Sequence, residues 1–174
     1  MEFAAILLFY LGCVFLLISV HEFGHYLAGR IGGISGNDLR IRLLAFPQHV
    51  QLRSGEDWVS PTAHIDTYVQ LVWEYLGTKS KVYLYVAGGF LGETLFTVSL
   101  GIALILWDHA KIAYAIVGLS LVMGLPWLIL DPIMILRGRI FGDISGLWFL
   151  NRALTIVFVL VLIGSRITLL WWAS

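Results

Sequence analysis

The chain has 174 residues, of which 59% are apolar and only 13% are charged. Soluble domains carry about 25% charged residues, so this composition excludes an ordinary soluble domain and favours a membrane protein. Eleven basic and eleven acidic residues cancel, which argues against a nucleic-acid partner. The length predicts a single domain over residues 1–174, and the one cysteine, Cys13, excludes an internal disulfide framework.

Four long apolar runs predict an all-α polytopic membrane protein with four transmembrane helices. Each run is long enough to cross about 30 Å of hydrocarbon at about 1.5 Å per residue. We expect the first run to be retained, because it lacks the basic start and the small-residue cleavage pattern of a secretory signal. The runs cover residues 3–20, 82–107, 112–130 and 153–173.

Basic residues gather in two of the connections, which predicts the orientation in the bilayer. Lys and Arg favour the cytoplasmic side, so the amino terminus and the turn at residues 107–112 should face outward. On the outer side we find Lys111 and Arg166, and we interpret Arg166 as a side chain that snorkels to the interface. The residues in the two basic connections are Arg30, Arg40, Arg42, Arg53, Lys79 and Lys81 in the first, and Arg137, Arg139 and Arg152 in the second.

The first connection, residues 30–81, has structure of its own. Residues 39–43 and 49–53 alternate apolar and polar side chains on either side of Pro47, which predicts a β-hairpin. Ser60 and Pro61 are typical of a helix start, and apolar residues then recur at helical spacing up to Gly77. This helix either lies along the membrane surface or packs on the hairpin as a small soluble lobe.

The chemically informative motif is His21-Glu22-Phe23-Gly24-His25, which continues the first apolar run. On a helix, residues four apart share a face, so His21 and His25 can bind one metal ion with Glu22 beside them. In zinc enzymes of this kind, a third protein ligand completes the site and the carboxylate acts as general base on the metal-bound water. Ionisable groups within a membrane helix are costly, which favours a metal site over a charged helix face, bound haem or a hydrogen-bonded cluster.

A third ligand should come from another helix on the same side of the bilayer. Asp143 fits, because it lies in the second basic connection or opens the last membrane helix. Its alternative role is that of a helix N-cap. Asp131 is the weaker candidate, because an Asp-Pro pair is a common turn opener.

Glu93 is a second anomaly within an apolar run. We interpret its carboxylate as a partner of a ligand histidine or as a group that orients substrate, and a direct metal ligand is the further alternative. Gly88 and Gly92 form a small-residue face suited to close helix packing, and Gly88 and Gly89 are candidate substrate or ligand-supporting positions. The other histidines, in polar surroundings, are expected at the surface: His49, His64 and His109.

Taken together, these motifs resemble the site-2 protease family of intramembrane zinc metalloproteases. The resemblance rests on the His21-to-His25 motif, a glycine-rich motif in the next helix and an aspartate in a later segment. It implies that His21, His25 and Asp143 bind Zn²⁺, that Glu22 is the catalytic base, and that the hairpin at residues 39–53 pairs with an unwound substrate. The family's middle motif usually reads Gly-Pro with a downstream Asn, whereas this chain has Gly88-Gly89.

The sequence therefore predicts a zinc endopeptidase that cuts membrane-protein substrates in or near their transmembrane segments, close to the cytoplasmic face. Two alternatives stay open. A haem-binding or electron-transfer protein would need axial histidines from different helices, but the two histidines of the motif share one helix. A pseudoprotease that binds membrane segments or gates a partner without cutting is the other alternative, since the middle motif departs from the family's. The oligomeric state is not predicted.

Overall fold

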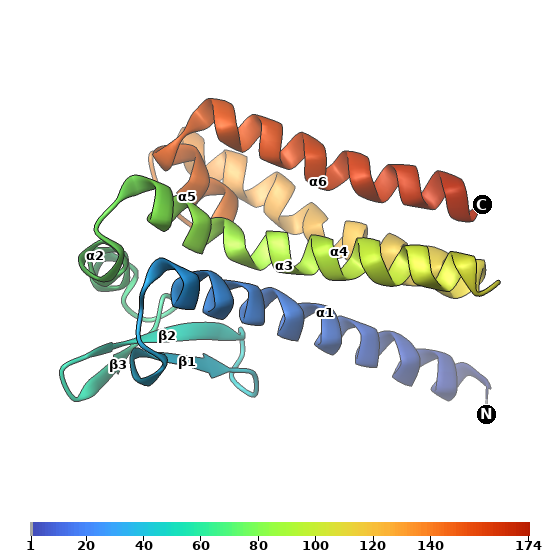
Figure 1. Ribbon diagram of the computed structural model, residues 1–174, viewed down its shortest axis with the longest axis horizontal. Coiled ribbons are helices and arrows are strands. Elements are labelled where there is room, and N and C mark those ends of the chain that lie inside the picture. The colour runs from blue at the N-terminus through green and yellow to red at the C-terminus, as the bar shows by residue number, and fades with distance from the viewer. Residues whose placement is uncertain (1) are drawn as a thin grey trace. The chain divides into compact units, whose positions relative to one another are not determined.

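A computed structural model describes residues 2–174 as helices joined to one small sheet (Figure 1). Within these residues, four helices are long and apolar enough to cross a membrane, namely α1, α3, α4 and α6. The predicted all-α polytopic fold is thereby confirmed. The elements are α1 (Glu2–Gly32), β1 (Leu39–Arg42), β2 (His49–Ser54), β3 (Asp57–Val59), α2 (Ile65–Leu76), α3 (Lys79–Leu106), α4 (Ala110–Leu136), α5 (Asp143–Leu150) and α6 (Arg152–Ala173).

The chain divides into two compact units. One consists of residues 18–92 and contains the sheet, α2, the second part of α1 and the first part of α3. The other consists of residues 1–17 and 93–174 and contains α4, α5 and α6 with the remaining parts of α1 and α3.

In the unit of residues 18–92, the predicted hairpin is part of an antiparallel sheet with strand order β1-β2-β3. Leu39 pairs with Leu52 and Leu52 with Val59, and all three side chains are buried, so one face of the sheet is apolar. Helix α2 packs on this sheet, because Tyr68 donates a hydrogen bond to the carbonyl oxygen of Val50 on β2. The third strand was not predicted, because a strand of three residues is too short to show alternation.

The start of α2 differs from the prediction. Ser60 does not cap this helix; its hydroxyl accepts from the backbone N–H of Thr62, and its carbonyl accepts from His64 in a single isolated turn. The helix begins at Ile65 instead. Its end is as expected, because Gly77 adopts φ +67°, a left-handed conformation that glycine reaches without steric cost.

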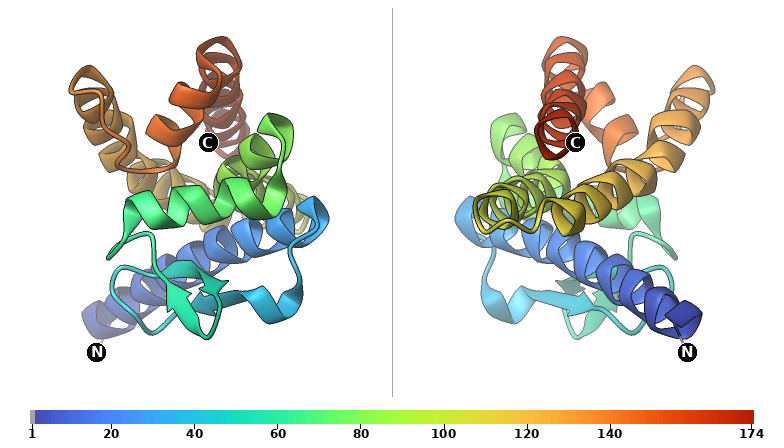
Figure 2. Two further views of the ribbon diagram at one scale, coloured as in Figure 1. Left: turned by 90° about the vertical axis from the view of Figure 1, so that its left-hand side faces the viewer. Right: turned by 90° about the vertical axis from the view of Figure 1, so that its right-hand side faces the viewer.

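In the other unit, α5 lies between α4 and α6 (Figure 2). Helix α4 runs six residues beyond the predicted end at residue 130 and includes Pro126 and Pro132, so Asp131 is helical rather than part of a connection. Asp143 opens the short separate helix α5 and not the last membrane helix, which begins only after Asn151. The N-cap of α5 is Gly142, so the alternative role of Asp143 as an N-cap is wrong.

Candidate metal centre

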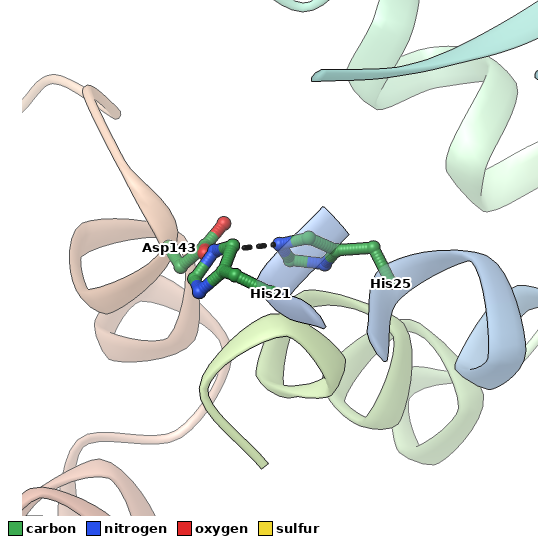
Figure 3. Close-up of side chains that lie close together, drawn as sticks. All are labelled: His21, His25 and Asp143. Carbon is green, nitrogen blue, oxygen red and sulfur yellow. Dashed lines mark hydrogen bonds between the residues drawn. The ribbon is translucent and has the colours of Figure 1, made fainter. Parts of the chain in front are cut away.

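His21 and His25 project from one face of α1 and turn their rings toward each other (Figure 3). Their Nε2 atoms are 3.2 Å apart. Nδ1 of His25 is 2.9 Å from the backbone carbonyl oxygen of Tyr85, to which a neutral ring donates its Nδ1 proton. The Nε2 atom of His25 then keeps its lone pair, which is the form that binds a metal ion.

The separation of the two Nε2 atoms fits a shared tetrahedral ion. Zinc–imidazole bonds are about 2.0–2.1 Å long, so two such nitrogens at a tetrahedral angle lie about 3.3–3.4 Å apart. The observed 3.2 Å is close to this value. The i, i+4 spacing of α1 thus brings both nitrogens to the distance that one ion requires.

Gly89 on α3 faces the same two nitrogens. A Cβ atom at this position would collide with Nε2 of both His21 and His25. With the two rings placed as they are, a side chain at residue 89 would take the space beside both histidine nitrogens. Gly89, which the sequence marked only as a supporting or substrate position, therefore bounds the candidate metal position.

Close packing of α3 on α1 brings Gly89 to this place. Gly24, within the histidine motif, lies so close to Gly88 that a Cβ on Gly24 would collide with the Gly88 carbonyl oxygen. A Cβ on Gly92 would lie 2.9 Å from the Cα of Gly24. The small-residue face formed by Gly88 and Gly92 is therefore confirmed as a site of close backbone approach.

Aromatic side chains enclose the two imidazoles. The Phe90 ring meets His21 edge-on, with ring centroids 4.9 Å apart. The Tyr85 ring lies against His25, and the Tyr85 hydroxyl is 2.5 Å from the hydroxyl of Tyr68, which in turn donates to the carbonyl oxygen of Val50. A continuous set of contacts thus links β2 to the ring of His25.

Two further predicted site residues lie in different surroundings. Glu22 follows His21 on α1 and is only 8% exposed. Asp143 is half-buried at the first position of α5, which belongs to the other compact unit. Its role as the third ligand accordingly stays a prediction.

Glu93 is part of an ion pair. Its Oε1 accepts from the guanidinium of Arg166 at 3.2 Å and from the hydroxyl of Ser120 at 2.6 Å. Arg166 also donates to Ser120 and Thr94 and is only 4% exposed. The interpretation of Arg166 as a snorkelling side chain is therefore wrong, because its charge is compensated inside the bundle by α3.

One of the three remaining histidines also departs from expectation. His64 and His109 are exposed as predicted, but His49 is 9% exposed and bonds through Nδ1 to the carbonyl oxygen of Pro47. Strand pairing places His49 opposite Arg42 at the start of β2. The local polarity of the sequence could not indicate this burial, because burial depends on the packing of the sheet.

Three contacts that involve predicted site residues were missed from the sequence. The carbonyl group of Tyr85 carries no sequence signal, since any residue has one. Arg166 as the partner of Glu93 could have been suspected from charge alone, because a basic and an acidic residue both interrupt apolar runs. The carboxylate of Asp131 on α4 accepts hydrogen bonds from Ser145 on α5, and these depend on the packing of α4 against α5, for which the sequence carries no signal.

Comparison with known proteins identifies no relative. The chain matches no protein-family model, no curated protein and no solved structure.

Proposed function

We propose that this chain is an intramembrane zinc metalloprotease in which His21, His25 and Asp143 bind the metal and Glu22 acts as general base. The observation that carries the proposal is the pair of Nε2 atoms 3.2 Å apart in a space that a Cβ at Gly89 would fill. Two imidazoles held in this way are suited to a cation. Four apolar helices place the motif in a multi-pass membrane protein.

The proposed ligand set consists of two imidazole nitrogens, from His21 and His25, and one carboxylate oxygen, from Asp143. Three protein ligands of these kinds are typical of catalytic zinc, which keeps its fourth position for water. A thiolate ligand is not expected, because the single cysteine, Cys13, lies outside the motif.

The reaction is peptide-bond hydrolysis. Held by His21, His25 and Asp143, a zinc ion would supply Lewis-acid chemistry, which lowers the pKa of a water molecule and polarises the scissile carbonyl group. Glu22 takes a proton from that water as its oxygen bonds to the carbonyl carbon. The same carboxyl then gives the proton to the leaving amine as the C–N bond breaks, which returns Glu22 to its starting state.

Substrates on this proposal are membrane proteins with an unwound segment. A peptide bond in a helix is shielded by its own hydrogen bonds, so the segment must become extended before cleavage. Among the described residues β1 pairs with β2 alone, so its outer edge can accept a peptide strand. The distribution of Lys and Arg supports a cytoplasmic position for the reaction and an outward amino terminus.

The test combines a metal assay with cleavage by the purified, detergent-solubilised chain. We expect stoichiometric zinc in the wild type, and we expect Glu22→Gln to keep the zinc but lose cleavage of co-expressed single-span membrane proteins tagged at both ends. Asp143→Asn should lower zinc content, whereas Glu93→Gln should leave it unchanged. The exposed Asp66→Asn on α2 is a matched control.

Each failure has its own meaning. A wild type without zinc contradicts the proposal as a whole. Full zinc content in Asp143→Asn together with a loss in Glu93→Gln would assign the third ligand to Glu93. Zinc binding with no cleavage of any substrate by the wild type would favour the non-catalytic alternative.

A further inference from the structure

The short helix α5 carries Asp143 at its first position, but its N-cap residue has no side chain. Helices leave their first backbone N–H groups without intrahelical partners, and Ser, Thr, Asp or Asn usually accept from them at the N-cap. Here the N-cap is Gly142. The cap must therefore come from elsewhere in the fold.

Asp131 supplies this cap from α4. Its Oδ2 accepts from the backbone N–H of Ser145 at 3.1 Å, and its Oδ1 accepts from the Ser145 hydroxyl at 3.1 Å. The Ser145 oxygen in turn accepts from the backbone N–H of Phe141 and of Gly142, at 2.9 and 3.0 Å. The carboxylate of Asp131 on α4 thus holds Ser145, and the Ser145 hydroxyl links it to the backbone of Phe141 and Gly142 at the start of α5.

The geometry leaves little room for a conventional cap at the same time. A Cβ at residue 142 would lie 3.0 and 3.1 Å from the two carboxylate oxygens of Asp131. Asp131 and Ser145 are both fully buried, so water does not compete for these hydrogen bonds. Gly142 and Asp131 are therefore complementary: the missing side chain on α5 makes space for the carboxylate from α4.

We propose that Asp131 is a positioning residue for the metal site: it fixes the first turn of α5 and thereby the backbone that carries Asp143. The inference rests on the proposed function, because it takes Asp143 as a ligand. Eight residues are too few for a helix that is stable by itself, so the place of Asp143 depends on this anchor. Residues that orient metal ligands typically change metal affinity about 10- to 100-fold when they are lost.

The experiment measures zinc affinity of the full chain in detergent by competition with a chelator. We expect Asp131→Ala to weaken zinc binding at least tenfold. Adding Gly142→Ser to this variant should restore affinity, because serine then supplies the missing cap where the carboxylate has been removed. The φ of −134° at Gly142 is open to serine, although its Cβ would lie 3.0 Å from the edge of the half-exposed Trp127 ring.

The matched control removes a cap from the neighbouring helix. The Asn151 side chain accepts from the backbone N–H of Leu154 at the start of α6. Asn151→Ala removes a bond of the same kind, and we expect it to leave zinc affinity within twofold of wild type. The rate of backbone hydrogen exchange in residues 141–147 should increase in Asp131→Ala and fall back to the wild-type rate in the double variant.

The outcomes separate this inference from the proposed function. If Asp143→Asn keeps wild-type affinity, the ligand set is wrong and the inference falls with it. If Asp143→Asn loses zinc but Asp131→Ala does not, the inference alone is overturned. Should Asp131→Ala fail to fold, Asp131→Asn is the milder variant, because it removes one of the two acceptors. Unchanged zinc affinity in Asp131→Asn overturns the inference. Failure of Gly142→Ser to restore the folded, zinc-binding state of Asp131→Ala overturns it as well.

Discussion

Two polar clusters interrupt the apolar helices of this protein: one is a pair of opposite charges and the other is a pair of imidazoles. In the unit of residues 1–17 and 93–174, Glu93 and Arg166 carry opposite charges and neutralise each other. In the unit of residues 18–92, His21 and His25 are two bases of one kind that present nitrogens to each other. The first cluster has its counter-charge within the protein, whereas on the proposed function a cation between the rings would stabilise the second.

The largest effect is expected from a substitution that fills the space beside His21 and His25. Because a Cβ at residue 89 would collide with both Nε2 atoms, we expect Gly89→Ala to abolish zinc binding. Zinc content of the purified variant is the measurement. Gly12→Ala, on α1 with open space around it, is the control and should keep its zinc. Stoichiometric zinc in Gly89→Ala would show that the ion does not lie beside Gly89.

Loss of the ion pair between Glu93 and Arg166 should lower the stability of the protein rather than its zinc content. Glu93→Gln leaves the Arg166 guanidinium buried without its counter-charge, so we expect a loss of about 3–5 kcal/mol in the free energy of unfolding. Unfolding by denaturant in detergent measures this loss. The double variant Glu93→Gln with Arg166→Met removes both charges and should recover much of the stability.

This second prediction also tests whether the clusters are independent. We expect Glu93→Gln to keep its zinc, because the structure gives its carboxylate a partner in Arg166. Equal stability of the single and double variants would mean that the pair contributes little to folding. Loss of zinc from a folded Glu93→Gln variant would show that zinc binding at the histidines depends on Glu93.

The smallest expected effect concerns the link between the sheet and His25. Tyr68→Phe removes the hydroxyl that joins Val50 and Tyr85, which should cost about 1–3 kcal/mol of stability. We also expect zinc affinity to fall by a few-fold, measured by chelator competition, because the backbone of Tyr85 orients His25.

Tyr75→Phe on the same helix is the matched control for this effect. Its hydroxyl donates to the carbonyl oxygen of Arg53 on β2, at a distance of 2.8 Å, and it bonds to neither Tyr85 nor Val50. We expect a modest loss of stability and unchanged zinc affinity. Equal effects of the two variants on zinc would contradict a specific link from the sheet to the histidine.

The sequence by itself determined the elements that depend on local pattern. Four apolar runs predicted the four long helices, and alternation in residues 39–53 predicted the pairing of β1 with β2. The convergence of His21 and His25 followed from helical spacing alone, because residues four apart always share a face. None of these features requires knowledge of a distant part of the chain.

Only the tertiary structure decided which distant groups complete each cluster. The pairing of Arg166 with Glu93 joins residues 73 positions apart, and the contact of Asp131 with Ser145 depends on how α4 approaches α5. The role of Gly89 likewise required the close packing of α3 on α1. The physical reason is that burial and hydrogen bonding between helices are properties of their packing, whereas spacing along one helix is a property of the sequence.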